Sequence, residues 1–318
     1  MIITQTPLRI SFLGGNTDLP AYFKEYGGSI LTTAIDKYIY CIVNKRFDDE
    51  IWINYSEKER VTQVADIKHD IVREALKLTN ITSGVEISFL SDIPSKGSGL
   101  GSSSSVAVGV LNALYHYKGM QLTQAELAAR ACLIEIDILK KPIGVQDQII
   151  AAYGGLRHIT LGDSTLITRL ELPESTLNDF NNSLMLFYTN ITRKAEKILA
   201  GVKLDKKNLD RQKELANRGV VCLKLGDIKK IGGLINEYWE LKKKFNGKVT
   251  DPNINIMYKK ARKAGAIGGK IVGAGGGGFL LLMVPQEKCE AVRKALVDHK
   301  EMQFRFDPYG SRVIFNNG

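Results

Sequence analysis

The strongest signal in this chain is a run of glycines and serines from Pro94 to Ser105, which reads PSKGSGLGSSSS and directly precedes an apolar, helix-length stretch. Glycines allow backbone N–H groups to turn toward an anion, and the first turn of a helix adds unpaired N–H donors and the positive end of its dipole. A strand is expected just before the run, at residues 85–90. Strand, glycine loop and helix in this order predict a site for the phosphates of a nucleoside triphosphate.

A second glycine cluster lies near the end of the chain, at Gly273–Gly278. It contains the spacing G-x-G-x-x-G of dinucleotide-binding folds, but the apolar run that follows it stops at Pro285 and predicts a strand instead of a helix. A Walker loop is not expected either, because Ile271 follows Gly269-Lys270 where a serine or threonine is required. We expect this cluster to let two backbone segments approach closely and shape a site, with a plain glycine turn as the alternative.

The composition is that of an ordinary globular protein. The chain has 318 residues, 44% hydrophobic and 25% charged, which is enough for two lobes or one large domain. We expect no membrane partner, because no stretch approaches the roughly 18 uninterrupted apolar residues of a membrane span and the first residues show no secretory leader. Four widely separated cysteines without a C-x-x-C pair predict reduced thiols in a cytoplasmic protein and no zinc site.

The formal net charge of +10 raises the question of a nucleic-acid partner. The lysines are scattered, and their densest cluster, Lys242–Lys244, closes a predicted helix, where cations favour the helix dipole. No interleaved aromatic platform accompanies them, so we expect a solvated basic surface and no nucleic-acid partner. Such a field attracts small anionic substrates such as ATP and a sugar phosphate.

The order of predicted elements divides the chain. The first third alternates strands with turns, and residues 47–49 are predicted to be a hairpin turn between strands at 37–45 and 50–55. Thr123 and Glu126 form a capping box for a helix that continues to Ile138. After residue 184 the pattern becomes a strand followed by several helices, one of which starts at Asp227. A lobe boundary is predicted between residues 162 and 182, where periodicity is interrupted.

Three motifs in this order resemble the galactokinase, homoserine kinase, mevalonate kinase and phosphomevalonate kinase superfamily, the GHMP kinases: residues 7–18 (PLRISFLGGNTD), 94–105, and 270–278 (KIVGAGGGG). The resemblance implies an α+β, two-lobe fold with the active site between the lobes. The N-terminal lobe, residues 1–170, would contain the family's left-handed βαβ crossover, an exception to the usual right-handed rule. The helix-rich C-terminal lobe would span residues 171–318, and the chain could form a homodimer.

Within the superfamily, the first motif together with residues 144–148 (GVQDQ) and 187–193 (FYTNITR) looks most like the D-glycero-D-manno-heptose 7-phosphate kinases. These transfer the γ-phosphoryl group of ATP to the anomeric hydroxyl and give the 1,7-bisphosphate. Heptose kinases commonly have a third glycine where this chain has Asn16, which leaves the sugar open. The alternatives are a kinase of an unphosphorylated sugar such as fucose, and a non-catalytic, basic nucleic-acid-binding protein on this fold.

The resemblance also implies where ATP and Mg²⁺ bind. The nucleotide would lie on the loop residues Pro94, Lys96, Gly97, Ser98, Gly99, Leu100, Gly101, Ser102, Ser103 and Ser104. The Ser103 hydroxyl and the Glu135 carboxylate would bind Mg²⁺, which prefers oxygen ligands. Ser102 and Ser104 are close alternatives to Ser103, and at least one of these serines could serve only as a helix cap. A surface ion pair is the alternative for Glu135.

Asp147 matches the catalytic aspartate of the family, which orients the acceptor hydroxyl or takes its proton, and Arg9 matches a basic residue beside it. The alternatives are a helix N-cap for Asp147 and a strand-edge surface position for Arg9. Asp18 would accept hydrogen bonds from sugar hydroxyls, with Gly15, Asn16 and Thr17 in the same wall. The remaining predicted substrate contacts are a phosphate clamp formed by Arg193 and Lys194, which could instead face solvent, and the glycines Gly275 and Gly276.

Overall fold

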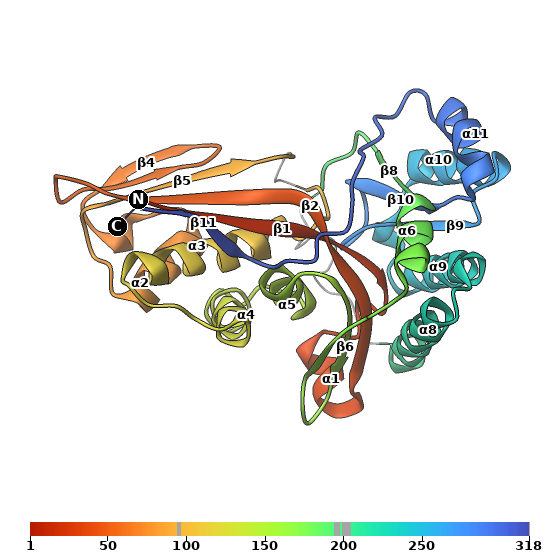
Figure 1. Cartoon of the computed structure of the whole chain (residues 1–318), viewed down its shortest axis with the longest axis horizontal. Helices are drawn as coiled ribbons and strands as arrows, with labels where there is room; N and C mark the ends of the chain where they lie inside the picture. The colour runs from red at the N-terminus through yellow and green to blue at the C-terminus, as the bar shows by residue number, and fades with distance from the viewer. Residues whose placement is uncertain (94–96, 194–197, 199–204, 318) are drawn as a thin grey trace.

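The structure is a computed structural model that describes residues 1–93, 97–193, 198 and 205–317. Figure 1 shows a long sheet with helices against one of its faces at one end of the molecule, and a helix-rich part around a smaller sheet at the other end. The Pro94, Lys96 and Lys194 predictions lie outside the described residues.

Among the described residues, the larger sheet has eight strands around the long antiparallel pair β1 and β2. Both strands are rich in β-branched residues, which favour extended backbone. The register of the pair shifts between Pro7 and Leu8, so β2 pairs with β5 over one half and with β6 over the other. The strands are β1 (Ile2–Leu13), β2 (Gly28–Lys45), β3 (Ile51–Asn54), β4 (Lys58–Val61), β5 (Val85–Ser91), β6 (Leu156–Leu161), β7 (Leu166–Arg169) and β11 (Arg312–Asn316).

The predicted hairpin at residues 47–49 is wrong. The chain does turn there, but β2 and β3 are not neighbours, because β5 lies between them and pairs antiparallel with β2 and parallel with β3. The apolar side chains Val85 and Ile87 of β5 are fully buried in this central position. A parallel pair needs a long connection, and here it runs through β4, the short 3₁₀ turn Val64–Asp66 and a helix.

Helices cover one face of this sheet (Figure 1). They are α2 (Asp70–Thr79), α3 (Ser102–Tyr117), α4 (Gln124–Cys132) and α5 (Gln146–Tyr153). The capping box of Thr123 and Glu126 is confirmed at the start of α4. The helix that was predicted to continue to Ile138 changes instead to a π-helix over Leu133–Ile138. Such π segments re-aim side chains and are frequent at functional sites.

The second part of the molecule surrounds a three-stranded sheet in the order β8, β10, β9. Asp227 caps α9 as predicted, by accepting a hydrogen bond from the Lys230 N–H. The elements of this part are α6 (Glu174–Asn182), α8 (Lys206–Lys224), α9 (Ile228–Phe245), α10 (Pro252–Lys263), α11 (Cys289–Ala295), the strands β8 (Leu184–Tyr188), β9 (Gly268–Ile271) and β10 (Phe279–Met283), and the 3₁₀ turns Gly247–Val249 and Gln286–Lys288. The short helix α1 (Pro20–Tyr26) belongs to the first part, where it connects β1 to β2.

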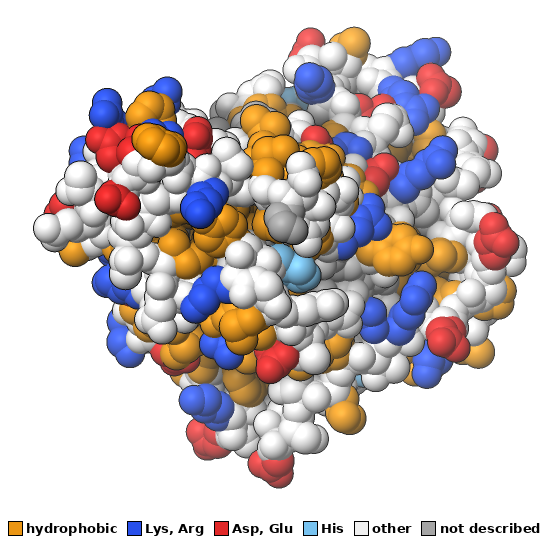
Figure 2. All heavy atoms as spheres, turned by 60° about the vertical axis from the view of Figure 1, so that its left-hand side comes forward, with side chains coloured by type: hydrophobic (Ala, Val, Ile, Leu, Met, Phe, Trp, Pro, Cys, Tyr) orange, Lys and Arg blue, Asp and Glu red, His pale blue; other side chains and the backbone are white. Residues whose placement is uncertain are grey.

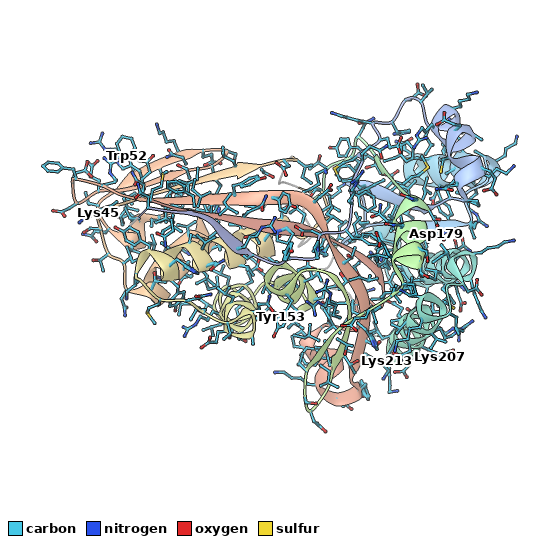
Figure 3. The ribbon with its side chains drawn as sticks, in the orientation of Figure 1. Lys45, Trp52, Tyr153, Asp179, Lys207 and Lys213 are labelled. Atoms are coloured by element: carbon cyan, nitrogen blue, oxygen red, sulfur yellow. The ribbon has the colours of Figure 1, made fainter. Side chains whose placement is uncertain are left out.

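The two parts share contacts that cross the middle of the chain. One hydrophobic core joins Leu8 and Phe12 of β1 with Leu281 of β10. Lys213 of α8, labelled in Figure 3, donates a hydrogen bond of 2.6 Å to the Tyr26 carbonyl at the end of α1. The last strand, β11, pairs with β1. We keep the division into residues 1–170 and 171–318 as a proposal, in which the C-terminal strand returns to the first sheet.

Figure 2 shows lysine and arginine side chains spread over the viewed face among acidic and apolar ones, and not gathered in one patch. Trp52 and Lys45 lie at the outer end of the long sheet in Figure 3, where the Arg46 guanidinium stacks 4.0 Å from the centre of the Trp52 ring. The four cysteines are free thiols. No helix within the described part of the chain is long and apolar enough to cross a bilayer.

Candidate active site

A cavity of about 1080 Å³ lies where the two parts meet, and motifs that are far apart in the sequence line it. Its walls come from the first motif, the glycine loop, residues 141–147, helix α9 and the second glycine cluster. The cavity is large enough for a nucleotide and a sugar together. The residues that line it include Arg9, Ser11, Gly15, Asn16, Asp18, Tyr55, His69, Phe89, Gly97, Ser98, Gly99, Gly101, Ser102, Ser103, Ser104, Lys141, Gln146, Asp147, Arg193, Tyr238, Lys242, Lys270, Gly273 and Gly275.

The described part of the glycine loop leads directly into helix α3, as predicted. Gly101 is the N-cap residue of α3 and has a positive φ of 78°, a conformation that favours glycine. The Ser98 and Ser102 hydroxyls share a hydrogen bond of 3.1 Å. Leu100 does not line the cavity: its side chain is fully buried in the core, and its carbonyl accepts from the Arg9 N–H at 2.9 Å. The start of α3 therefore points into the cavity, which suits an anionic group.

The second glycine cluster packs against this loop, which confirms the predicted close approach of two backbones. A Cβ atom on Gly273 would lie 2.5 Å from the Gly99 carbonyl oxygen, so a side chain has no room there. Gly275 lines the cavity, whereas Gly276 turns away from it and its N–H bonds the Val249 carbonyl at 2.6 Å. The cluster therefore supports the glycine loop of residues 97–101 from behind.

We expect the variant Gly273→Ala to weaken ATP binding about tenfold, because the new methyl group would lie 2.5 Å from the Gly99 carbonyl oxygen and must push the two loops apart to reach ordinary contact distance. The strain of alanine at positive φ also lowers the free energy of unfolding by about 1–2 kcal/mol. The matched control is Gly119→Ala, since Gly119 has a similar φ of 73° but open space around it. Calorimetric titration with ATP and thermal unfolding of both variants separate crowding from backbone strain. Equal ATP affinity in the two variants would contradict the expectation.

Asp147 and Arg9 form a bidentate ion pair beside the glycine loop. The Arg9 Nε and Nη2 atoms each donate a hydrogen bond of 2.6 Å to a different Asp147 oxygen, and Nη1 donates to the Gly99 carbonyl at 2.6 Å. The Arg9 side chain is 6% exposed, and that of Asp147 is 23% exposed. Arg9 is therefore not a surface residue, and Asp147 is not the N-cap of α5, which is Val145. The pair leaves the carboxylate at the edge of the cavity and in contact with the loop.

The Glu135 carboxylate is fully buried in the π-helix and faces the start of α3. It accepts hydrogen bonds from Ser103 Oγ, from Ser104 Oγ at 2.7 Å and from Gln148 Nε2 at 2.7 Å. Ser104 is buried by this contact, whereas Ser103 is exposed. A surface ion pair is thus excluded for Glu135, and Ser103 is the hydroxyl that remains accessible.

The donor set around Glu135 fits Mg²⁺. A carboxylate and a hydroxyl oxygen lie together at the cavity, and a protein cation already approaches both: Lys141 Nζ is 3.5 Å from Glu135 Oε1 and 3.3 Å from Ser103 Oγ. Mg²⁺ typically takes one or two carboxylates from a protein and completes its shell with waters and phosphate oxygens. The position of the lysine ammonium marks where the structure favours positive charge.

Asp18 is buried against residues 144–146, which explains the glycine at position 144. A Cβ atom on Gly144 would collide with the Asp18 carboxylate. The Gln146 N–H donates to Asp18 Oδ2 at 3.1 Å, while Asp18 Oδ1, Ser11 Oγ and Gln146 Oε1 have no hydrogen-bond partner among the described residues. Burial, with the nearby Asp147 carboxylate, raises the pKa of Asp18 to about 7. Orphaned buried polar atoms that border a cavity are suited to bind a polar ligand.

The variant Asp18→Asn should make the ligand-free protein more stable at pH 8 by about 2–4 kcal/mol, because the asparagine is not charged when buried. The pKa of Asp18 is raised from its ordinary value of 3.8 to about 7 in the folded protein. As the pH rises through this window, Asp18 ionises in the unfolded chain while it stays protonated in the folded protein, so the free energy of unfolding of the wild type falls. The advantage of the variant should therefore vanish near pH 4. Urea unfolding at pH 4, 6 and 8 measures the difference in free energy of unfolding between Asp18→Asn and the wild type. The control is Asp163→Asn, at an exposed position. A constant difference at all three pH values would contradict this.

The structure places some of the other predicted acceptor-binding residues at the cavity and one of them away from it. The Gly15 carbonyl accepts from Gln146 Nε2 at 3.0 Å, and Asn16 Nδ2 donates to Gln212 of α8 at 2.9 Å. Thr17 does not reach the cavity: its side chain is fully buried and donates to the Gly14 carbonyl at 2.8 Å, which holds the motif in shape. Arg193 is exposed and lines the cavity close to Gly97.

Several cavity residues were not predicted from the sequence. The His69 ring stacks on Phe89 with 5.8 Å between centroids, and Tyr55 packs edge-on against His69 at 4.8 Å. Burial lowers the pKa of His69, which favours the neutral imidazole. These residues come from separate elements and form no motif in the sequence. The same holds for Lys141 and Lys242, whose type alone suggests only surface charge. Lys270 begins the third motif, at residues 270–278, but no role was predicted for its side chain.

A glycine loop that leads into a helix, with an arginine-paired carboxylate beside it at the same cavity, is typical of a small-molecule kinase, and the comparisons with known proteins agree. Residues 62–155 match the GHMP kinases N terminal domain, and residues 220–300 match the GHMP kinases C terminal domain. The D-glycero-alpha-D-manno-heptose 7-phosphate kinase of Campylobacter jejuni is 31% identical to this chain, and the alignment covers 93% of each of the two proteins. The chain therefore belongs to the GHMP kinase family and is an ATP-dependent phosphotransferase with an alcohol acceptor.

One solved structure and one further kinase sequence are also similar to this chain. The solved structure of a D-glycero-D-manno-heptose 1-phosphate kinase from Bacteroides thetaiotaomicron superposes with a TM-score of 0.83 over 100% of both chains at 24% identity, which confirms the α+β, two-lobe fold. The L-fucokinase/L-fucose-1-P guanylyltransferase of Bacteroides fragilis is 26% identical over 93% of this chain and 36% of its own length.

Proposed function

We propose that this kinase transfers the γ-phosphoryl group of ATP to the anomeric hydroxyl of D-glycero-D-manno-heptose 7-phosphate and forms the 1,7-bisphosphate. The observation that carries the proposal is the Arg9–Asp147 pair at the glycine loop, beside the orphaned polar atoms of Asp18, Ser11 and Gln146. The 31% identity to the Campylobacter jejuni enzyme supports the choice of acceptor.

The nucleotide would lie along the wall from the aromatic side chains to the glycine loop. The base would pack against His69 and Phe89, whose rings offer an apolar face. The phosphates would bind the backbone N–H groups of residues 97–103, where the start of α3 adds its positive end. In this pose the terminal phosphoryl group points toward Asp147.

Asp147 would orient the acceptor hydroxyl and take its proton. Phosphoryl transfer requires mainly positioning and charge stabilisation, so one aligned carboxylate is sufficient. Arg9 directs this carboxylate through two hydrogen bonds, and its positive charge would lie close to the forming negative charge.

Glu135 and Ser103 would hold Mg²⁺, which when bound neutralises charge on the nucleotide phosphates. Gln148 and Ser104 orient the Glu135 carboxylate through hydrogen bonds to Oε2, which leaves Oε1 directed at Ser103. Lys141 would have to move away from both oxygens when the metal ion binds.

The acceptor would bind on the Asp18 wall. Sugar hydroxyls donate to the unpartnered Asp18 Oδ1 and Gln146 Oε1, and exchange hydrogen bonds with Ser11 Oγ. Asn16 and Gly15 border the same space. Arg193, exposed near Gly97, remains the proposed clamp for a distal phosphate.

A kinase of an unphosphorylated sugar such as fucose is the second candidate, favoured by the similarity to the Bacteroides fragilis fucokinase. The test offers ATP and Mg²⁺ with a panel of hexoses, heptoses and their terminal phosphates, and locates the new phosphate by ³¹P and ¹³C NMR. We expect turnover with the heptose 7-phosphate and a new phosphate on the anomeric carbon. Turnover only with unphosphorylated sugars would overturn the proposal in favour of the second candidate.

Size-exclusion chromatography with light scattering tests the proposed homodimer.

A further inference from the structure

Lys242 is a buried cation that the mechanism above does not use. It lies in the last turns of α9, is 3% exposed, and lines the cavity. Its Nζ atom donates a hydrogen bond to the Gly273 carbonyl, in the cluster that supports the phosphate-binding loop. An ammonium group has three donors, and this is the one hydrogen bond that Nζ makes to the described residues. Its remaining donors are therefore available at the cavity.

The charges around Lys242 are mostly positive. No carboxylate of the described residues lies within ion-pair distance of it, in contrast to Lys141, which approaches Glu135 and Asp70. The nearby charged groups are Arg9, already paired with Asp147, and Lys270. Burial, with the positive charge of Arg9, lowers the pKa of Lys242 to about 7. The ligand-free protein thus holds a desolvated amino group without a counter-ion, and an anion beside it would favour the charged ammonium form.

Lys270 is satisfied by contrast. Its Nζ donates to the carbonyls of Ser11 at 2.7 Å and Phe12 at 3.2 Å, and it lies 4.4 Å from the centre of the Tyr238 ring. Lys270 therefore joins β9 to the first motif through hydrogen bonds, and burial, with the nearby Lys242 and Arg9, lowers its pKa well below the ordinary value. A buried charge is unfavourable unless it is paired, so Lys242, which makes one hydrogen bond to the described residues, favours an anionic ligand in the cavity.

We infer that Lys242 binds a phosphate group of a substrate, either the terminal phosphoryl of the nucleotide or the phosphate carried by the acceptor. The inference rests on the proposed function, because that reaction brings both groups into this cavity. Lys242 lies beside Gly273, which packs against Gly99 of the glycine loop, and close to Arg9. From this position its ammonium group could contact either phosphate. Unlike the exposed Arg193, Lys242 is already desolvated, which strengthens each hydrogen bond that it makes to a phosphate.

The test measures dissociation constants by calorimetry for four ligands: a non-hydrolysable ATP analogue with Mg²⁺, ADP with Mg²⁺, heptose 7-phosphate, and the same heptose without phosphate. Wild type is compared with Lys242→Met, which keeps the length of the side chain, and with Lys242→Gln, which keeps a donor for the Gly273 carbonyl. The matched control is Lys244→Met, two residues further along α9 and exposed. Circular dichroism and thermal unfolding confirm that each variant is folded.

We expect both Lys242 variants to lose about 10- to 100-fold in affinity for one phosphate ligand, with the control unchanged. A loss for the ATP analogue but not for ADP assigns the terminal phosphoryl; a loss for heptose 7-phosphate but not for the bare heptose assigns the acceptor. Affinities within twofold of wild type for all four ligands, or an equal loss for both heptoses, would overturn the inference. If wild type does not bind heptose 7-phosphate, the proposed acceptor fails while the nucleotide comparison still tests Lys242.

Discussion

Replacing Asp147 with asparagine is expected to lower kcat by about 10²- to 10⁴-fold, the usual contribution of a general base in proton transfer. The amide has nearly the same shape as the carboxylate but takes no proton from the acceptor hydroxyl and carries no charge for Arg9 to orient. ATP binding should change little, because in the proposed pose the glycine loop would contact the nucleotide through its backbone and would keep the hydrogen bond from Arg9 Nη1 to the Gly99 carbonyl. Steady-state kinetics and nucleotide titration of the same sample give both values.

The control for this variant is Asp163→Asn, an exposed aspartate in the turn between β6 and β7, which should have wild-type activity. Thermal unfolding is needed as well, since Asp147→Asn leaves the mostly buried Arg9 guanidinium without its counter-ion and is expected to lower Tm. A folded variant with kcat within threefold of wild type would remove Asp147 from the proton transfer and leave it as a structural partner of Arg9.

The variant Glu135→Gln is expected to reduce kcat/KM at low Mg²⁺ by about 10²-fold or more, because metal-bound charge contributes several kcal/mol to transition-state stabilisation. The side chain is fully buried, and its carboxylate accepts from Ser103, Ser104 and Gln148. A glutamine would turn an N–H group toward one of these donors and lose the negative charge. Two measurements check the expectation: the Mg²⁺ concentration for half-maximal rate should rise, and Mn²⁺ binding observed by electron paramagnetic resonance should weaken.

Asp137→Asn is the matched control for Glu135→Gln, because Asp137 belongs to the same π-helix but is exposed. It removes one negative charge close to the site without touching the start of α3. Identical Mg²⁺ dependence of Glu135→Gln and wild type would refute a metal-binding role, and a comparable shift in Asp137→Asn would indicate a general effect of charge.

The local parts of the fold could be predicted because the interactions that form them lie close together in the sequence. Thr123 and Glu126 cap α4 within one turn, and Asp227 caps α9 in the same manner. Glycines followed by an apolar helix predict a turn at positive φ and a helix start whatever surrounds them, and Gly101 confirms this. The predicted hairpin failed because strand pairing depends on distant competition: β5 displaces β3 as the neighbour of β2.

The candidate active site, like the fold, could be predicted only in part from the sequence. The sequence by itself determined which groups could carry the chemistry, because Arg9, Asp18 and Asp147 lie in motifs that resemble those of the family, and the same resemblance points to Glu135. Only the tertiary structure decided which atoms meet and which lose water: it paired Arg9 with Asp147, left Asp18 Oδ1 without a partner, and buried Lys242 without a described carboxylate. Sequence spacing does not reveal such desolvation, since burial arises from chain segments more than a hundred residues apart.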